Sequence, residues 1–200
     1  MLFRSKDFPA NNLQEFIAYA KANQKTMQFA SAGAGSATHL GCALINARIG
    51  IDVTHVPYRG GAPAMQDLIA QRVDYLCIDT PTALPQIESG AIKPIAILSR
   101  GRSPSLPDLA SAHEQGLTGF EATNWSAFFL PKNTPASVVQ RLHDASVAAM
   151  NDPIVARRFK ENGIDIAGDE RRSSTYLGQF VTDEIAKWAG PIKSSGLVLE

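Results

Sequence analysis

The chain has 200 residues, of which 44% are hydrophobic and 19% charged, a composition typical of a globular protein with a substantial core. Lys plus Arg and Asp plus Glu both number 19, so the formal net charge is zero. Because no basic run is present, a nucleic-acid partner is not expected, and no stretch approaches the roughly 18 apolar residues of a membrane helix.

The first residues, Met1 to Asp7, lack the apolar segment of a secretory signal. Three interpretations stay open at this point. The protein is cytoplasmic, or its signal is not included, or the chain begins inside a longer protein.

Residues 11–98 alternate between the signals of helices and strands. Asn11 or Asn12 is placed to cap a helix that carries Leu13 and Phe16 at helical spacing, and Gly50 is placed to end a helix over 37–49. Further helices are expected after Gly60 and Gly61 and over 81–87, and strands over 26–30, 52–57, 73–78 and 94–98. Short loops in this order predict an α/β fold with a mostly parallel sheet covered by helices.

Beyond this unit the character of the sequence changes. Residues 99–119 are rich in Pro, Ser and Gly, and 121–130 have the composition of a strand. Helices are then expected over 135–150, from Pro153, and over 175–194, with a short strand or turn over 163–168. Residues 1–120 are therefore predicted to form a complete α/β unit, whereas 121–200 supply too few strands to close a second sheet.

The two cysteines, Cys42 and Cys77, lie in apolar surroundings on an expected helix and an expected strand. Small buried hydrophobic residues are the simpler interpretation. A disulfide is the other, although two cysteines do not make a disulfide framework.

The loop Ser31-Ala32-Gly33-Ala34-Gly35-Ser36 joins an expected strand to an expected helix. Small residues let the backbone approach a ligand closely, and the following helix start offers unpaired N–H groups and a partial positive charge. This arrangement is typical of a carboxylate or phosphate site, in which Ser36 caps the helix or donates to the ligand. A plain tight turn with a capping serine is the alternative. The incomplete G-x-G-x-x-G pattern, with Thr38 in place of the last glycine, argues against a dinucleotide.

Two more strand-to-helix loops carry polar or glycine residues. The second holds Tyr58, Arg59, Gly60 and Pro63, and the third holds Asp79. Tyr58 offers a hydroxyl, while Arg59 is either a ligand contact or a surface residue and Asp79 is either a ligand contact or a helix cap. Binding sites of parallel sheets form at the carboxyl ends of the strands, so the coincidence of three such loops favours a site there.

An enzyme is not expected. Ser36, His39 and Asp79 would be the members of a hydrolase triad, but the sequence around Ser36 does not match G-x-S-x-G. His39 alone is typical of a structural histidine, although it is also placed to line a cleft. No histidine has metal-ligand spacing with another or with a cysteine, so neither metal nor cofactor is expected.

Several segments together resemble one family. Its motifs are G-x-G-[ST]-x-x-H-L, V-P-Y-[KR]-G-x-x-P-A, R-x-x-x-x-P-D and E-x-G-x-x-G-[FY]. The matching segments here are residues 33–40, 56–64, 102–108 and 114–120, and Glu184 to Trp188 recur near the family's C-terminus. The chain resembles the Bug receptors, which are the substrate-binding proteins of tripartite tricarboxylate transporters (TctC type).

The resemblance covers nearly the whole chain and implies a two-lobed fold of the type II periplasmic-binding-protein class. It implies a solute receptor, periplasmic in location, that binds a small carboxylate (a di- or tricarboxylate, an acidic amino acid or an aromatic acid) and passes it to membrane transporter subunits. It also places the ligand contacts on one wall of the cleft, at Ser31, Ala32, Gly33, Gly35, Ser36, His39, Tyr58, Arg59, Gly60, Pro63 and Asp79.

The chain departs from the family at its start. Family members have a signal peptide and a further segment that builds the first half of lobe one, and neither precedes Met1 here. Residues 1–120 would then be the second lobe and 121–200 the returning part of an incomplete first lobe. Exposed apolar faces would follow, so a homo-oligomer that covers them is expected. A truncated protein with an interaction or sensor role and little ligand affinity is the alternative function.

Overall fold

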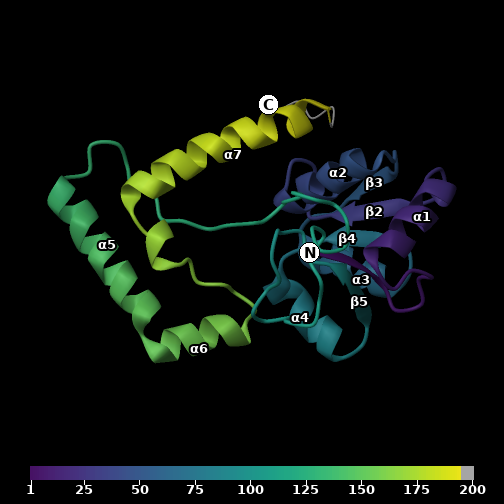
Figure 1. The fold of residues 1–200 in the computed structure, drawn as a ribbon, viewed down its shortest axis with the longest axis horizontal. Coiled ribbons are helices and arrows are strands. Elements are labelled where there is room, and N and C mark those ends of the chain that lie inside the picture. The colour runs from purple at the N-terminus through teal and green to yellow at the C-terminus, as the bar shows by residue number, and fades with distance from the viewer. Residues whose placement is uncertain (195–200) are drawn as a thin grey trace.

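The computed structural model describes residues 1–194 and divides them into an α/β unit and a set of helices beside it (Figure 1). The helices and strands, in chain order, are β1 (Leu2–Ser5), α1 (Leu13–Asn23), β2 (Gln28–Ser31), α2 (Ala37–Ile49), β3 (Thr54–Pro57), α3 (Gly61–Ile69), β4 (Tyr75–Cys77), α4 (Thr80–Glu88), β5 (Ile92–Ala96), α5 (Ala136–Asn151), α6 (Pro153–Glu161), the short 3-10 helix η1 (Asp169–Arg171) and α7 (Ser174–Ser194).

The five strands form one sheet in the order β3-β2-β4-β1-β5. β2 pairs in parallel with β3 and with β4, whereas β1 runs antiparallel between β4 and β5. Four strands therefore share one direction, which confirms the mostly parallel sheet. β1 was not expected from the sequence. All four of its residues are buried, and the guanidinium of Arg4 donates to the carbonyls of Ser5 and Lys6 at 3.0 and 3.1 Å, so its charge is solvated by the backbone.

Helices cover both faces of the sheet and enclose two apolar clusters. One cluster contains Phe16 of α1, Ile45 of α2 and the strand residues Phe29 and Tyr75. The other contains Leu68 of α3 together with Phe3, Leu76, Ala83 and Ile92. Full burial of such side chains contributes about 1.5–3 kcal/mol each. These clusters, rather than the helices beyond residue 130, therefore supply most of the stability of the chain.

Capping residues fix the helix ends that flank the sheet. The side chains of Asn12 and Ser36 accept hydrogen bonds from the backbone N–H groups of Glu15 and His39, at 2.9 and 3.2 Å. Gly50 ends α2 in the left-handed region, with φ of 72°, as the sequence predicts. The observed bounds of α2 agree with the predicted range, because Ser36 caps the start of the helix and Gly50 ends it.

Cys42 of α2 and Cys77 of β4 form a disulfide, with their Cα atoms 5.4 Å apart. The simpler interpretation of two buried thiols is therefore wrong. The sequence separation of 35 residues hides the pairing, because α2 lies across the sheet and brings Cys42 above β4. The disulfide fixes the helix that begins at the Ser31–Ser36 loop to the centre of the sheet.

Residues 121–130 are extended but do not form the strand that their composition predicts, and 163–168 contain no strand either. In the described part of the chain, one backbone hydrogen bond, from Ala122 N–H to Leu98 O at 2.8 Å, ties 121–130 to the residues after β5, and no ladder continues from it. The preference of a sequence for strand is realised only through a continued pairing with a neighbour. The long helices α5, α6 and α7 follow each other around an open frame beside the α/β unit (Figure 1).

Among the described residues, helices α5, α6 and α7 with their connections (the frame) touch the α/β unit in two regions. In one region, α7 contacts α2. Nearby, the carboxylate of Glu184 in α7 accepts hydrogen bonds from the indole of Trp125, in the extended segment, and from that of Trp188 at 3.2 and 3.0 Å. In the other region, Ser103 donates to Asp165 at 3.3 Å. Among residues 1–194, no helix combines the length and the apolar character that crossing a membrane requires.

Candidate functional site

The three loops singled out in the sequence lie side by side at one end of the sheet. They follow β3, β2 and β4, which are neighbours in the sheet and share one direction. Backbone hydrogen bonds join the first two loops: Tyr58 N–H donates to Ser31 O at 3.0 Å and Gly60 N–H to Ala32 O at 3.2 Å. The structure therefore brings together residues that are about thirty positions apart in the sequence.

The Ser31–Ser36 loop is held by its own side chains. The hydroxyl of Ser31 accepts from Gly33 N–H at 3.1 Å, Thr38 Oγ1 accepts from Ala32 N–H at 2.7 Å, and the hydroxyl of Ser36 donates to Gly33 O at 2.7 Å. Gly33 has φ of 130°, and a Cβ atom there would lie 3.4 Å from Tyr58 O. Glycine is therefore favoured at this position by the backbone conformation, and the second loop lies in close contact with it.

These internal bonds decide which peptide groups are available to a ligand. The N–H groups of Ala32, Gly33 and Gly35 already have acceptors within the loop or helix. Within residues 1–194, by contrast, no acceptor is found for the N–H groups of Ala34, Ala37 and Thr38. They surround the positive end of α2, where an anionic oxygen is favoured. The sequence analysis did not single them out, because which N–H groups are free depends on where the side chains of Ser31 and Thr38 point.

Two histidines lie beneath this loop with their rings stacked. The rings of His39 and His55 have centroids 3.8 Å apart and planes 5° from parallel. His39 Nδ1 accepts from Gly35 N–H at 3.1 Å, and His55 Nε2 lies 2.7 Å from the hydroxyl of Ser31. Burial lowers the pKa of His39. Burial, and then the neighbouring His39, lower the pKa of His55 to about 4, so both rings are neutral at neutral pH.

Tyr58 does not direct its hydroxyl toward the loop. The hydroxyl donates to Asp67 of α3 at 2.7 Å, and Asp67 also forms an ion pair with Arg72 at 2.8 Å. Burial and this hydrogen bond raise the pKa of Tyr58 to about 12. Tyr58 therefore fixes the second loop to α3 through its side chain, and its backbone N–H fixes the same loop to the first.

The remaining predicted residues lie around these loops. Arg59 is exposed, and Pro63 is half-buried in the first turn of α3. Asp79 is exposed after β4 and caps α4 by accepting from Thr82 N–H at 3.3 Å. Asp79 thus acts as a helix cap, whatever contact it makes with a ligand.

The side chains of Ser36, His39 and Asp79 are not arranged as a catalytic triad. Ser36 Oγ is bonded to Gly33 O and to Thr38 Oγ1 rather than to an imidazole nitrogen, and His39 Nδ1 is occupied by Gly35 N–H. The described residues also contain no cluster of three or more His, Cys, Asp or Glu side chains that would hold a metal ion.

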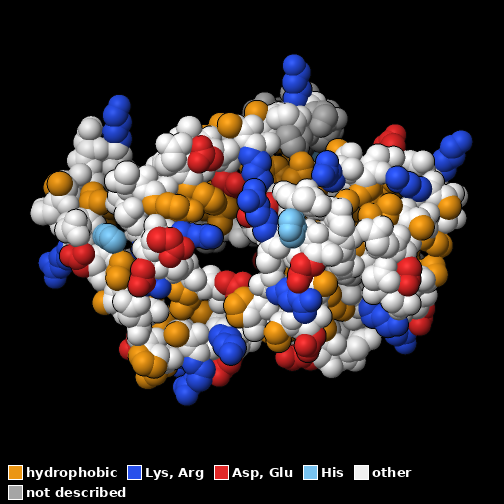
Figure 2. Space-filling model, in the orientation of Figure 1, with side chains coloured by type: hydrophobic (Ala, Val, Ile, Leu, Met, Phe, Trp, Pro, Cys, Tyr) orange, Lys and Arg blue, Asp and Glu red, His pale blue; other side chains and the backbone are white. Residues whose placement is uncertain are grey.

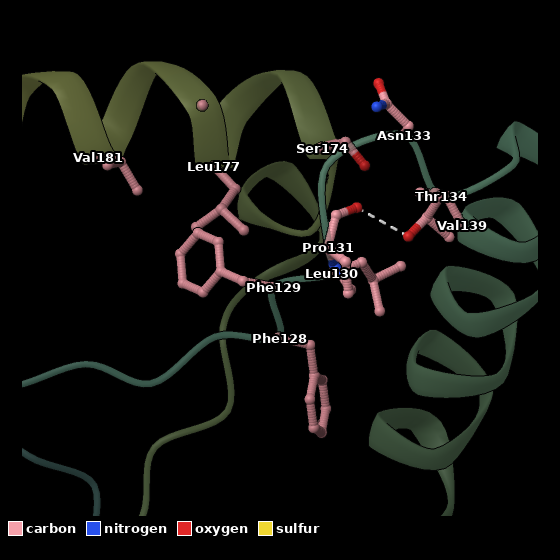
Figure 3. A pocket seen from close by; sticks show the side chains of 11 residues that line it. Phe128, Phe129, Leu130, Pro131, Asn133, Thr134, Val139, Ser174, Leu177 and Val181 are labelled. Atoms are coloured by element: carbon pink, nitrogen blue, oxygen red, sulfur yellow. Dashed lines mark hydrogen bonds between the residues drawn. The ribbon is translucent and has the colours of Figure 1, made fainter.

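A cavity of about 440 Å³ lies elsewhere, in the frame of helices (Figure 3). Its lining includes Phe128, Phe129 and Leu130 of the extended segment and Leu177 and Val181 of α7. No charged side chain is among the residues that line it. A carboxylate would lose its hydration there without gaining a charged partner, because the polar side chains of the lining are the neutral ones of Asn133, Thr134 and Ser174. We therefore regard it as a packing surface rather than a site for an anion.

A mostly parallel sheet with helices on both faces, and with free N–H groups in the loops at the strand ends, is the fold found in periplasmic-type solute-binding proteins. The family model of the tripartite tricarboxylate transporter family receptor (TctC) matches residues 1–197, and the chain belongs to this family. A curated relative from Agrobacterium vitis, described as a UPF0065 protein, is 32% identical over 191 residues, which are 96% of this chain and 55% of the relative.

Two solved structures show the same fold. MatC from Rhodopseudomonas palustris, with bound malate, is 33% identical with a TM-score of 0.85, and the match covers 96% of this chain and 65% of MatC. An R. palustris protein with adipate is 28% identical with a TM-score of 0.87, covering 98% of this chain and 64% of that protein. This coverage fits a fold whose first lobe is incomplete here, and the chain spans about half the length of the curated relatives it matches.

Proposed function

We propose that this chain carries one wall of the binding cleft of a receptor for a small carboxylate. The observation that supports this proposal is the group of free N–H donors of Ala34, Ala37 and Thr38 at the start of α2. A carboxylate oxygen accepts charge-assisted hydrogen bonds from such groups, and the positive end of the helix adds to them. That one structural neighbour has bound malate and another adipate agrees with this chemistry.

In this proposal the ligand lies over the Ser31–Ser36 loop and beside the Tyr58–Pro63 loop. Ala32, Gly33 and Gly35 shape the loop, while Ser36 and His39 hold it in place. Arg59 and Asp79 lie at the mouth, where they select among ligands by charge. Residues 1–120 form the ligand-binding lobe, and 121–200 belong to the opposite lobe, whose closure over the ligand would exclude water.

Calorimetric titration with malate, adipate, citrate, glutamate and benzoate tests the proposal. We expect saturable binding of at least one of them, with a dissociation constant on the order of 1 mM or tighter, which corresponds to about 4 kcal/mol. Absence of any binding in that range would contradict the proposal for this chain. An Ala37→Pro variant lacks one of the three donors, and proline is well tolerated at the first position of a helix. We therefore expect weaker binding with little loss of stability.

We further propose that the receptor works in the periplasm and delivers its ligand to a tripartite tricarboxylate transporter. The family membership and the disulfide between Cys42 and Cys77 support this proposal, because structural disulfides persist in oxidising compartments. Fractionation of cells that express the protein from its native gene locus, followed by uptake assays in a deletion strain, tests both statements. A cytoplasmic protein, or unchanged carboxylate uptake, would count against them.

The frame of helices is proposed to associate with a second copy of the chain. Apolar side chains of α5, α6 and the extended segment are exposed along it (Figure 2), among them Phe128 at 86%, Phe129 at 64% and Leu142 at 47%. The formal net charge is zero, so two copies do not repel each other. Covering such faces removes apolar surface from water.

Light scattering at micromolar concentration tests this association. We expect a dimer or higher oligomer that dissociates in a Phe129→Glu/Leu142→Glu variant. The control Ala22→Glu introduces a charge at an exposed position of α1 and should leave the mass unchanged. A wild-type monomer without aggregation would exclude the homo-oligomer.

A further inference from the structure

His39 and His55 connect the binding loop to the interior of the sheet. His39 belongs to α2 and is 6% exposed, and His55 belongs to β3 and is half-buried. The ring of Phe29, from β2, stacks on His55 at 4.8 Å with planes 21° apart. Tyr75, from β4, stacks on Phe29 at 5.6 Å. The two imidazoles are thus the outer members of a continuous aromatic layer over three neighbouring strands.

Each imidazole makes one hydrogen bond upward to the loop. His39 Nδ1 accepts from Gly35 N–H, so this nitrogen carries a lone pair and the ring is neutral. His55 Nε2 meets the hydroxyl of Ser31, which in turn accepts from Gly33 N–H and donates to Gly33 O. The two bonds hold the two ends of the segment 31–35, between which Ala34 presents its free N–H.

The bond of His39 depends on the neutral state of its ring, because Nδ1 must keep its lone pair to accept from Gly35 N–H. In the His55 bond Nε2–H is the donor, because the only proton of the Ser31 hydroxyl goes to Gly33 O. A proton on His39 Nδ1 would point at the N–H of Gly35 and would break the bond that holds it. Two stacked cations 3.8 Å apart would also repel each other.

The surroundings offer no compensation for such a charge. β2 presents Phe29, and β4 presents Tyr75, whose hydroxyl is bonded to Asn46 of α2. Cys42 of α2 is held in the disulfide. In the described part of the chain, His39 is the one titratable neighbour found to lower the pKa of His55, and burial alone lowers the pKa of His39.

We propose that His39 and His55 are positioning residues of the carboxylate site: in their neutral forms they hold Gly35 and Ser31, and so aim the free N–H groups of the loop at the ligand. This inference rests on the proposed function. It adds that the pair acts through the loop rather than by touching the carboxylate, so that the hydrogen bonds to Gly35 and Ser31 decide affinity. The presence of an imidazole ring does not by itself decide affinity.

Conservative replacements separate this role from simple packing. In His39→Asn the side-chain oxygen takes the place of Nδ1, and in His55→Gln the side-chain amide takes the place of Nε2. Both keep the hydrogen bond and lose the ring. His39→Ala and His55→Ala lose both. His113→Ala is the matched control, because His113 Nδ1 likewise accepts from a glycine, Gly119 N–H at 3.0 Å, away from the site.

The first measurement is hydrogen exchange of the Gly35 amide without any ligand, followed by NMR. We expect protection in the wild type and in His39→Asn, and exchange at least roughly tenfold faster in His39→Ala, while His113→Ala leaves Gly35 unchanged. The second measurement is affinity for malate and adipate by calorimetry at neutral pH. We expect roughly tenfold weaker binding in each alanine variant, and values within about threefold of wild type in His39→Asn and His55→Gln.

The two measurements distinguish the proposed function from the positioning role. If neither acid binds the wild type, the proposed function loses its support while the exchange of Gly35 still decides the positioning role. Gly35 protection that survives His39→Ala would overturn the inference, and so would an Asn variant as impaired as the Ala variant. Melting temperatures of all variants show whether a loss follows from unfolding, and the Asn and Gln variants keep the test decisive if an alanine variant does not fold.

Discussion

Single side chains set the geometry of the candidate site. Ser36 acts in two ways at once, because its oxygen accepts from His39 N–H at the start of α2 and its hydroxyl donates to Gly33 O in the loop. Asn12 plays only the first of these roles, at the start of α1. This difference lets the cap and the loop contact be separated by experiment.

Replacing Ser36 with alanine should lower the free energy of unfolding by about 1 kcal/mol, as the loss of a helix cap does, and should also weaken carboxylate binding. Asn12→Ala should cost a similar amount and leave binding unchanged. Urea unfolding and calorimetry on the two variants provide the comparison. Equal affinities in both would show that Ser36 is only a cap.

The stability of the chain should fall as pH is lowered from about 6.5 toward 4. The folded-state pKa of His55 is lowered to about 4, below the ordinary value of 6.5 that applies to the unfolded chain. Between these values the unfolded chain binds a proton that the folded chain does not, so the free energy of unfolding decreases with acid. Thermal unfolding across this range should show a smaller decrease in His55→Gln than in the wild type. Parallel curves for the two proteins would contradict the assignment.

At the residue scale, the sequence predicts the loops of the site but not the side-chain contacts that hold them. Ser31, Gly33 and Ser36 stand out because small residues between a strand and a helix have few structural purposes. His55 does not, since a histidine in a strand has no motif of its own and its partner His39 is sixteen positions away. The hydroxyl of Tyr58 was expected to be available, but Asp67, nine residues later, binds it.

At the scale of elements, the helices were predictable because their caps and periodicity are local. The strands differ. Leu2–Ser5 shows no alternation, because it is buried on both faces with Arg4 solvated by carbonyls, and so β1 was missed. Residues 121–130 look like a strand, but in the described residues their backbone bonds to a neighbour at Ala122 alone, where its N–H donates to Leu98 O. Strand formation depends on distant residues, which a local pattern does not contain.

The disulfide should contribute about 3–4 kcal/mol to the stability of the α/β unit, because it closes a segment of 35 residues in the unfolded chain. Unfolding in urea with and without a reductant measures this contribution. The double variant Cys42→Ala/Cys77→Ala should resemble the reduced protein and should not respond to the reductant. A wild type that is equally stable in both conditions would show that the bond is not formed in solution.

Glu184 connects helix α7 to the extended segment 121–130. It is 8% exposed and binds Trp125, Trp188 and Lys187. Glu184→Ala leaves two indole N–H groups without their acceptor and should cost about 1–3 kcal/mol, with a change in tryptophan fluorescence. Glu161→Ala, which removes an exposed pair with Arg157, should cost less than about 0.5 kcal/mol. Unaltered fluorescence in Glu184→Ala would argue against the hydrogen bonds between Glu184 and the two indoles.

At the scale of the whole molecule, the two parts differ in how they are stabilised. α2 has six buried residues and a disulfide, whereas α5 has no buried residue. A helix without tertiary packing retains only its own hydrogen bonds, which are marginal in water. The frame therefore depends on its contacts with the α/β unit and on whatever surface covers its apolar side.

Hydrogen exchange read by mass spectrometry should show this difference. We expect the amides of α5 to exchange at least roughly 100-fold faster than those of α2, equivalent to about 3 kcal/mol in the free energy of opening. The Phe129→Glu/Leu142→Glu variant, which should not associate, provides the reference for the uncovered frame. Equal protection of α5 and α2 in this variant would contradict the account.

The central position of β1 has a consequence for how the protein is made. Leu2 pairs with both Cys77 and Ala96, so β1 is synthesised before the other four strands of this sheet and is among the last to be paired. While the intervening residues are synthesised, an apolar segment waits without partners, and the sheet closes only after β5 has emerged. Such non-local pairing slows folding and lengthens the time during which the nascent chain exposes apolar residues to aggregation.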